Sequence, residues 1–252
     1  MMTTWLQQIG CLTYDCLDST NAEAKRLARA GHPPTWILAQ KQDNGRGSRG
    51  RSWSSKEGNF TASLLFYPLG NFLTLSNRSF VAGLAIYDSV KSLGIKDDRI
   101  LLKWPNDLLL DQKKLSGILL ETVQLNKHAI VNALIVGIGL NLISSPQLDR
   151  TESSLLPIAL RDVLGCQCPS AYDFLTLIAK SFLSWEKVYV EQGFSVIKSE
   201  WQDRTIPLGS IISIKDGQNI IKGKFDGIDN QGSLRVLTKH GIKVFSVADI
   251  FF

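Results

Sequence analysis

Apolar and polar positions along most of this chain follow patterns that predict a mixed α/β fold. Short apolar-rich runs between turn residues are typical of strands, whereas apolar positions three or four apart are typical of helices. Strands are predicted at 12–17, 37–40, 60–66, 100–104, 107–110, 115–123 and 129–138, and helices at 22–30, 75–93, 155–164 and 172–191. The last four strands are separated only by turn residues, so we expect an antiparallel meander.

The pattern changes after about Thr205. Short strands are predicted at 211–215, 220–225, 233–237 and 242–247, separated by turns that contain glycine. Evenly spaced short strands of this kind predict a small β-barrel. We therefore expect two domains, a larger α/β (α+β) domain at 1–203 and a C-terminal barrel at 204–252.

The composition is that of an ordinary globular protein, with 44% hydrophobic and 20% charged residues among 252. A net charge of +5 suits anionic ligands but is low for a dedicated nucleic-acid-binding protein. No apolar run reaches the roughly 20 residues of a membrane span, and the N-terminus lacks the features of a signal peptide. The four cysteines lack metal-ligand spacing, so we expect reduced thiols, no protein-held metal and a cytoplasmic location.

Residues 45–51 read Gly-Arg-Gly-Ser-Arg-Gly-Arg. Glycine lets the backbone approach a ligand closely, and arginine binds phosphate or carboxylate oxygens with two parallel hydrogen bonds. The spacing also satisfies G-x-G-x-x-G, but neither a helix start nor an acidic residue about 20 positions later follows, so a dinucleotide-binding turn is excluded. Three interpretations stay open: a loop that closes over an anion in an enzyme, an RNA contact, or a solvated loop.

Two further segments point to an enzyme. Lys103 stands between apolar residues and Trp104-Pro105 at the end of a predicted strand, an unusual place for a surface charge. Such a lysine can project into a cleft and meet a carboxylate or a phosphate. The segment 137–141 is a strand rich in glycine, where a ring of a ligand could lie against the backbone.

Taken together, these segments resemble the biotin–protein ligases along nearly the whole chain. The matching motifs are Ser19-Thr20-Asn21, Gln42, GRGSRGR with Trp53, KWPNDL at 103–108, KLSGILLE at 114–121 and GIGLN at 137–141. The resemblance implies a mixed-sheet catalytic domain of the class II synthetase type, followed by an SH3-like barrel.

The resemblance also implies a two-step reaction that uses ATP, biotin and Mg²⁺. Biotin and ATP give biotinyl-5′-AMP and pyrophosphate, and a lysine of a biotin carboxyl carrier protein, by default that of acetyl-CoA carboxylase, then accepts the biotin. Either a monomer or a homodimer is compatible with this reaction. The segment 144–156 is expected to order over the nucleotide.

Residue roles follow from the matching positions. The resemblance assigns biotin to Ser19, Thr20, Asn21, Gln42, Arg46, Gly47, Ser48, Lys103 and Gly117. It assigns the nucleotide to Arg46, Arg49, Arg51, Trp53, Asn106 and Asn141, and the catalytic charges to Lys103, Arg46, Arg49 and Arg51. Structural roles compete at several of these positions: a helix N-cap at Ser19 or Thr20, core packing at Trp53, a strand kink at Gly117, and turns at Asn106 and Asn141.

This sequence departs from the family pattern at Ser48, where an arginine is common. We expect the loss of one cation to loosen retention of the adenylate. Family members that repress transcription carry an N-terminal DNA-binding domain, and since the biotin signature here begins at residue 19, we expect ligase activity without DNA binding. A lipoate–protein ligase and an RNA-binding protein are the alternatives; the KWPND and GRGSRGR pair favours biotin.

Overall fold

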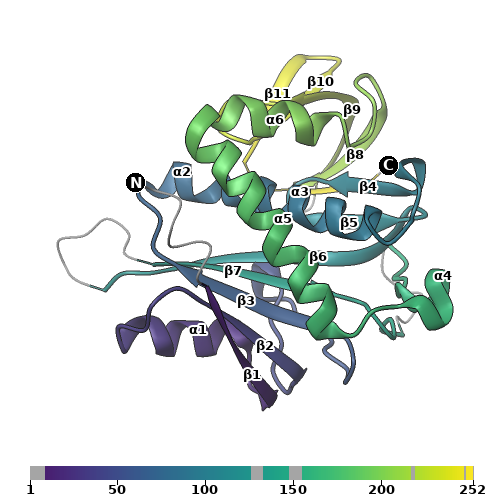
Figure 1. The fold of residues 1–252 in the computed structure, drawn as a ribbon. Coiled ribbons are helices and arrows are strands. Elements are labelled where there is room, and N and C mark those ends of the chain that lie inside the picture. Colours follow the sequence, from purple (N-terminus) through teal and green to yellow (C-terminus); the bar gives the residue numbers. More distant parts are fainter. Residues whose placement is uncertain (1–8, 126–132, 148–154, 217–218, 247, 252) are drawn as a thin grey trace.

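A computed structural model of the chain describes residues 9–125, 133–147, 155–216, 219–246 and 248–251. The larger domain is built on a seven-stranded sheet in the order β1-β2-β3-β7-β6-β5-β4 (Figure 1). Its strands are β1 (Gly10–Leu17), β2 (Thr35–Gln42), β3 (Phe60–Phe66), β4 (Ile100–Lys103), β5 (Asp107–Leu110), β6 (Lys113–Val123) and β7 (Ala133–Leu140). β1 and β2 are parallel and the other neighbours antiparallel, so the predicted mixed sheet and the meander from β4 to β7 are confirmed.

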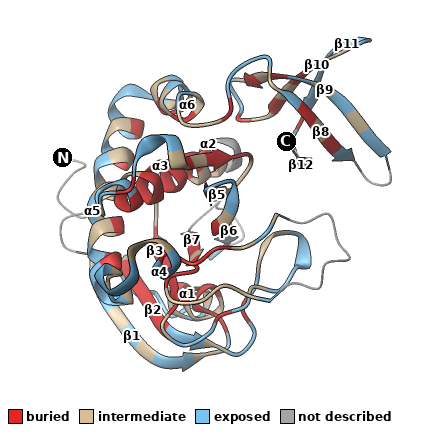
Figure 2. Cartoon of the chain, turned by 90° about the vertical axis from the view of Figure 1, so that its right-hand side faces the viewer, coloured by how far each residue is buried: buried red, intermediate tan, exposed pale blue. Residues whose placement is uncertain are grey.

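Helices cover both faces of this sheet. Helix α1 (Thr20–Arg29) packs on one face through Ala24 and Ala28. Helices α3 (Arg78–Lys91) and α5 (Ala171–Gln192) belong to the core on the other face, and Figure 2 shows α3 as a mostly buried helix. Successive residues of a strand point to opposite faces, and both faces of this sheet are covered by helices. The central strand β3 is therefore mostly apolar and is buried along its whole length.

The C-terminal domain is a small antiparallel sheet. Its strands are β8 (Ile211–Asp216), β9 (Asn219–Ile228), β10 (Leu234–Thr238), β11 (Gly241–Phe245) and β12 (Asp249–Phe251), in the order β11-β10-β9-β8-β12. Four of them were predicted, and the fifth, β12, was missed because three residues carry no recognisable alternation. We call this unit the C-terminal β domain. The prediction of a separate β domain at the end of the chain is therefore confirmed, and its strands are antiparallel.

Several helix predictions need correction. Residues 155–160 are not helical, since Pro157 pairs with Lys114 and the backbone there bonds to the start of β6; the helix is confined to α4 (Arg161–Leu164). The helix predicted at 75–93 is divided into α2 (Phe72–Ser76) and α3, and α6 (Phe194–Gln202) was not predicted. Ser19 is the N-cap of α1, but its side chain makes no capping hydrogen bond. Parts of the predicted strand 129–138 and of the segment 144–156 lie outside the described residues.

The two domains share one core. Buried side chains of the large domain, such as Phe80 and Leu102, belong to the same cluster as Ile212 and Val236 of the C-terminal β domain. Trp104 donates a hydrogen bond from Nε1 to the carbonyl of Gly232 at 2.9 Å. The backbone of Leu102 donates to the carbonyl of Arg204. The hairpin of β4 and β5 is therefore held directly against the C-terminal β domain.

Within the described part of the chain, no helix combines the length and the apolar character needed to cross a membrane.

Candidate active site

A cavity of about 1000 Å³ opens on the face of the sheet that carries α1. Along β7, Ile135 packs under α1, and the next positions on the same face, Gly137 and Gly139, have no side chain. The sheet is therefore bare just beyond the helix. The cavity is lined by every predicted site residue except Arg49, namely Ser19, Thr20, Asn21, Gln42, Arg46, Gly47, Ser48, Arg51, Trp53, Lys103, Asn106, Gly117 and Asn141.

The floor of the cavity is a pair of glycines. Gly117 of β6 lies opposite Gly139 of β7 in the sheet register. A Cβ atom added at Gly139 would collide with the indole of Trp53, and one at Gly117 would lie 3.3 Å from the same ring. The glycine-rich segment was expected to receive a ring of a ligand, whereas in this structure the indole ring of Trp53 lies against its backbone.

A polar network occupies the end of the cavity at α1. The side-chain oxygen Oε1 of Gln42 accepts a hydrogen bond from the backbone N–H of Thr20 at 2.8 Å. The hydroxyl of Ser63 lies 2.7 Å from Thr20 Oγ1 and 2.6 Å from Asn21 Oδ1. All of these groups except Gln42 are nearly inaccessible to solvent. Amide and hydroxyl groups held in fixed positions can recognise the donors and acceptors of a small polar ring.

Glu121 of β6 connects three parts of the site. Its carboxylate accepts hydrogen bonds from Asn21 Nδ2 at 2.9 Å, from Lys25 Nζ at 2.6 Å and from Arg46 at 3.1 Å. The first two partners belong to α1, and Arg46 belongs to the cationic loop. One carboxylate therefore fixes both the helix and the loop at this end of the cavity.

The cationic loop, residues 45–51, is held by its own backbone. Trp53 N–H donates to the carbonyl of Gly45 at 2.9 Å, and Gly47 N–H donates to that of Arg51 at 2.7 Å. A side chain at Gly45 would collide with the carbonyl oxygen of Trp53, so the close approach requires glycine. Arg49 adopts the left-handed region with φ of 59°, is exposed, and does not line the cavity.

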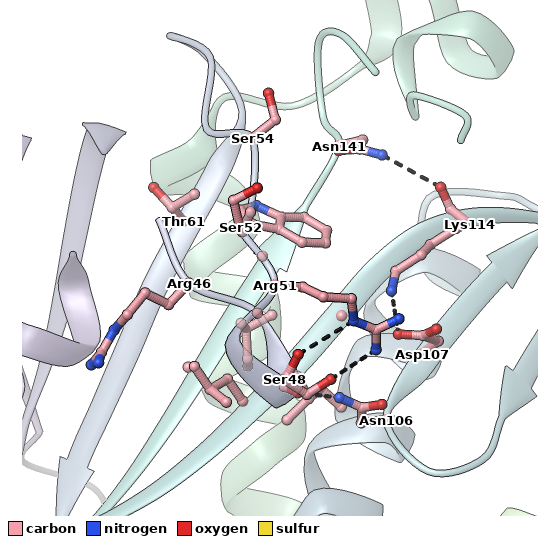
Figure 3. Close-up of a pocket in the computed structure, with 18 of the residues that line it drawn as sticks. Arg46, Ser48, Arg51, Ser52, Ser54, Thr61, Asn106, Asp107, Lys114 and Asn141 are labelled. Atoms are coloured by element: carbon pink, nitrogen blue, oxygen red, sulfur yellow. Dashed lines mark hydrogen bonds and ion pairs between the residues drawn. The ribbon is translucent and has the colours of Figure 1, made fainter. Parts of the chain in front are cut away.

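The arginines that do line the cavity point in opposite directions from the loop, as Figure 3 shows. Arg46 extends toward Glu121 and the α1 end. Arg51 extends toward Asn106 and Asp107, and its guanidinium donates to the backbone carbonyl of Ser48 at 3.3 Å and to the Ser48 hydroxyl at 3.1 Å. The two charges thus serve different ends of the cavity.

Lys103 comes from the last position of β4 and is only 7% exposed. In the register of the β4–β5 hairpin it lies opposite Asp107, whose carboxylate pairs with Lys114 at 2.6 Å. Asn106 in the turn donates to the carbonyl of Ile118 at 2.6 Å. Asn106 therefore joins the hairpin to β6, which is the structural role considered for it, while it also borders the cavity.

Asn141 at the end of β7 is almost fully buried. Its amide nitrogen donates to the carbonyls of Ile158 at 3.2 Å and Lys114 at 3.4 Å. These two hydrogen bonds hold the chain that enters α4 against the start of β6. The side-chain oxygen of Asn141 is then the group that a ligand could use.

The cavity is strongly cationic. Arg46, Arg51, Lys56, Lys103, Lys114 and Lys215 line it, against the single carboxylate of Asp107 among the described lining residues. Groups of this sign concentrated in one cleft attract and bind anions. The described residues contain no cluster of three or more histidine, cysteine, aspartate or glutamate side chains that could hold a metal ion.

Comparisons with known proteins cover both domains. A family model described as the biotin/lipoate A/B protein ligase family matches residues 4–141. The chain belongs to this family. A second model, described as the biotin protein ligase C terminal domain, matches residues 208–252. Membership of the biotin/lipoate ligase family favours the enzymatic interpretation of the cationic loop over an RNA contact or a solvated loop.

Relatives of the biotin/lipoate ligase family match along nearly the whole chain. The chain is 37% identical to the biotin–[acetyl-CoA-carboxylase] ligase of Paracoccus denitrificans, over 93% of this chain and 97% of that protein. It is 32% identical to the bifunctional ligase/repressor BirA of Bacillus subtilis, over 94% of this chain and 72% of that protein. A solved structure of the biotin protein ligase from Aquifex aeolicus in complex with biotin and ATP matches with a TM-score of 0.77 and 27% identity, over 96% and 98% of the two chains.

Several residues that shape this site were not predicted from the sequence. Ser63, Glu121, Lys114 and Lys215 were assigned no role. Ser63 carried a usable signal, since a serine inside the apolar run of β3 must find a hydrogen-bond partner. Lys114 and Glu121 belong to the KLSGILLE motif at 114–121, but no role was assigned to them, and Lys215 carried no signal, because its neighbours in the cavity come from distant parts of the sequence.

Proposed function

We propose that this protein is a biotin–protein ligase that activates biotin with ATP and transfers it to a lysine of a biotin carboxyl carrier protein. One observation carries the proposal: a network of fixed amides and hydroxyls and a set of cations share one cavity with a glycine floor. The network suits the ureido ring of biotin, and the cations suit its carboxylate and the phosphates of ATP.

In the first step the carboxylate oxygen of biotin attacks the α-phosphorus of ATP, and the bond to the bridging oxygen of pyrophosphate breaks. Both reactants are anions, so their approach has to be stabilised by positive charge. Lys103, buried at the strand end, would lie between the carboxylate and the α-phosphate. Arg51, on the side of Asn106 and Asp107, would offset charge on the phosphates.

The α1 end would orient biotin for this attack. Thr20, Asn21 and Gln42 are held by one another and by Ser63, so they are arranged before a ligand enters. Preorganised groups bind with less loss of conformational entropy. Arg46 lies at the same end, where Glu121 holds its guanidinium, and would close over the bound biotin.

In the second step the amine of the carrier lysine attacks the acyl carbon of biotinyl-5′-AMP and AMP leaves. No covalent enzyme nucleophile is needed, because the mixed anhydride is already activated. The cationic loop and Trp53 would cover the adenylate until the carrier arrives and so slow its hydrolysis.

Mg²⁺ would enter with ATP rather than occupy a protein site. Asp107 lines the cavity but is paired with Lys114, and Mg²⁺ in such sites is bound chiefly by phosphate oxygens and water. A bound Mg²⁺ would stabilise the pyrophosphate leaving group. We place the reaction in the cytoplasm, where ATP and the carrier protein of acetyl-CoA carboxylase are available.

The decisive experiment is exchange of labelled pyrophosphate into ATP by the purified protein, with biotin, with lipoate, and with neither. Biotin-dependent exchange is expected, together with biotin transfer to a carrier domain and none to a lipoyl domain. Lys103→Gln should lower exchange by about 10²–10³-fold without unfolding the protein. Exchange that depends on lipoate, or on neither acid, would refute the proposal.

A further inference from the structure

Two residues of the C-terminal β domain line the cavity of the larger domain. They are Lys215 of β8 and Ile250 of β12, strands that pair antiparallel, with Ile250 opposite Ile214 and Lys215 opposite Asp249. Ile250 is buried, whereas Lys215 is exposed. The C-terminal β domain thus adds one cation to the site from outside the catalytic domain.

Lys215 belongs to the end of the cavity that lies away from α1. Figures 1 and 2 both place α1 and the C-terminal β domain at opposite ends of the molecule. Between them is the β4–β5 hairpin, which carries Lys103 and contacts the C-terminal β domain through Trp104 and Gly232. The cavity therefore begins at the polar network of α1 and extends beyond the hairpin to Lys215.

The C-terminal β domain is fixed in this position. The hydrogen bond from Trp104 to Gly232 joins it to the hairpin, and the Leu102 backbone bonds to Arg204 in the segment that leads into it. The buried cluster is continuous across the two domains. Lys215 is consequently presented to the cavity by a rigid support. No described carboxylate forms an ion pair with it.

We infer that Lys215 is a binding residue for the β- and γ-phosphates of ATP, contributed to the catalytic site by the C-terminal β domain. The inference rests on the proposed function. If biotin occupies the α1 end and its carboxylate meets the α-phosphate at Lys103, the remaining ATP occupies the far end of the cavity. This remaining part of ATP consists of the adenosine and the pyrophosphate group, and the pyrophosphate group carries the negative charge that an exposed ammonium binds.

The test compares Lys215→Ala with Lys224→Ala in biotin-dependent pyrophosphate exchange at low ionic strength. Lys224 is a matched control: it is also exposed, is paired in register with Ile211 at the other end of β8, and does not line the cavity. Lys215→Ala should raise the KM for ATP about fivefold and leave the KM for biotin unchanged. Lys215→Arg should keep a near-normal KM, and Lys224→Ala should have no effect.

A second measurement separates the phosphates from the carrier. Transfer from preformed biotinyl-5′-AMP to the carrier domain involves no β- or γ-phosphate, so Lys215→Ala should leave its rate and its KM for the carrier unchanged. A normal KM for ATP in Lys215→Ala, or a raised KM for the carrier alone, would overturn the inference. Absence of biotin-dependent exchange in the unmodified protein would instead refute the proposed function.

Discussion

Trp53 lies with its indole ring on a part of the sheet that has no side chains. Gly139 leaves the space that the ring fills, and Gly117 lies opposite it in the register. The amine of Lys114 is 5.9 Å from the centre of the same ring, within the range of a cation–π contact. The indole ring of Trp53 can therefore occupy this position because Gly139 of β7 and Gly117 of β6 have no side chains.

Gly139→Ala should displace this ring. The added Cβ has no room beside the indole, and overpacking of this kind typically costs about 1–3 kcal/mol. We expect a lower melting temperature and, under the proposed function, in which Trp53 covers the nucleotide, a KM for ATP raised about tenfold in the exchange assay. Gly10→Ala, where an added Cβ meets nothing within 4 Å, is the control. Unchanged kinetics in Gly139→Ala would contradict the assigned place of the ring.

Ser48 stands in the cationic loop where the resemblance leads us to expect an arginine. Its hydroxyl accepts a hydrogen bond from Arg51, so it orients one cation instead of supplying another. Ser48→Arg should slow release of biotinyl-5′-AMP about fivefold, since one partly exposed charge contact is worth about 1 kcal/mol. Release is measured from each protein loaded with adenylate in the absence of carrier. Ser48→Ala controls for loss of the hydroxyl, and equal release by Ser48→Arg and the unmodified protein would dismiss the hypothesis.

At the scale of elements, a buried ion pair joins two helices. Arg78 of α3 and Glu186 of α5 are 3% and 1% exposed and lie 2.8 Å apart. Arg78 also lies over the ring of Tyr189 at 4.4 Å and donates to the carbonyl of Thr74. Burial raises the pKa of Glu186 above its ordinary value of 4.5, although Arg78 acts in the opposite direction.

Arg78→Met should therefore destabilise the protein in a pH-dependent way. A raised carboxyl pKa means that the folded state binds the proton more tightly than the unfolded chain, so stability from this group falls as the pH rises above about 4.5. Without Arg78, which lowers the pKa of Glu186, the rise in that pKa is larger. We expect a loss of about 3–5 kcal/mol at neutral pH and a smaller loss at pH 5.

Urea unfolding of the unmodified protein and of Arg78→Met at several pH values measures the difference in their free energies of unfolding. The double variant Arg78→Met/Glu186→Leu removes the buried carboxylate as well and should recover most of the stability at neutral pH. A loss that is the same at pH 5 and pH 7.5 would show that the carboxylate charge is not its cause.

At the scale of the whole molecule, the shared core has a thermodynamic consequence. The two domains are joined by one cluster of buried side chains and by the hydrogen bonds of the β4–β5 hairpin. We expect a single cooperative thermal transition, with equal calorimetric and van't Hoff enthalpies. Trp104→Phe, which removes the bond to Gly232 and keeps most of the packing, should lower the midpoint. Two separate transitions in the unmodified protein would show that the domains unfold independently.

Much of the fold could be predicted from local pattern. The strands β3 and β5 were predicted with their observed bounds, because turn residues mark both ends of an apolar run. The helix predicted at 155–164 was wrong over residues 155–160, because periodicity alone could not show that residues around Pro157 bond to β6, and only α4 at its end is helical. Helix α6 was missed between Gly193 and the change of pattern at Thr205.

For the candidate site, the sequence by itself determined which residue types are present and in what order: the cationic loop, Lys103 before a tight turn, and glycines in two strands. These are local features that depend on spacing along the chain. The tertiary structure alone decided that Glu121 joins α1 to the loop, that Arg46 and Arg51 point to opposite ends, and that Lys215 reaches the cavity from another domain. Such contacts depend on the insertion of β7 between β3 and β6 and on the docking of the C-terminal β domain, both set by packing between distant segments.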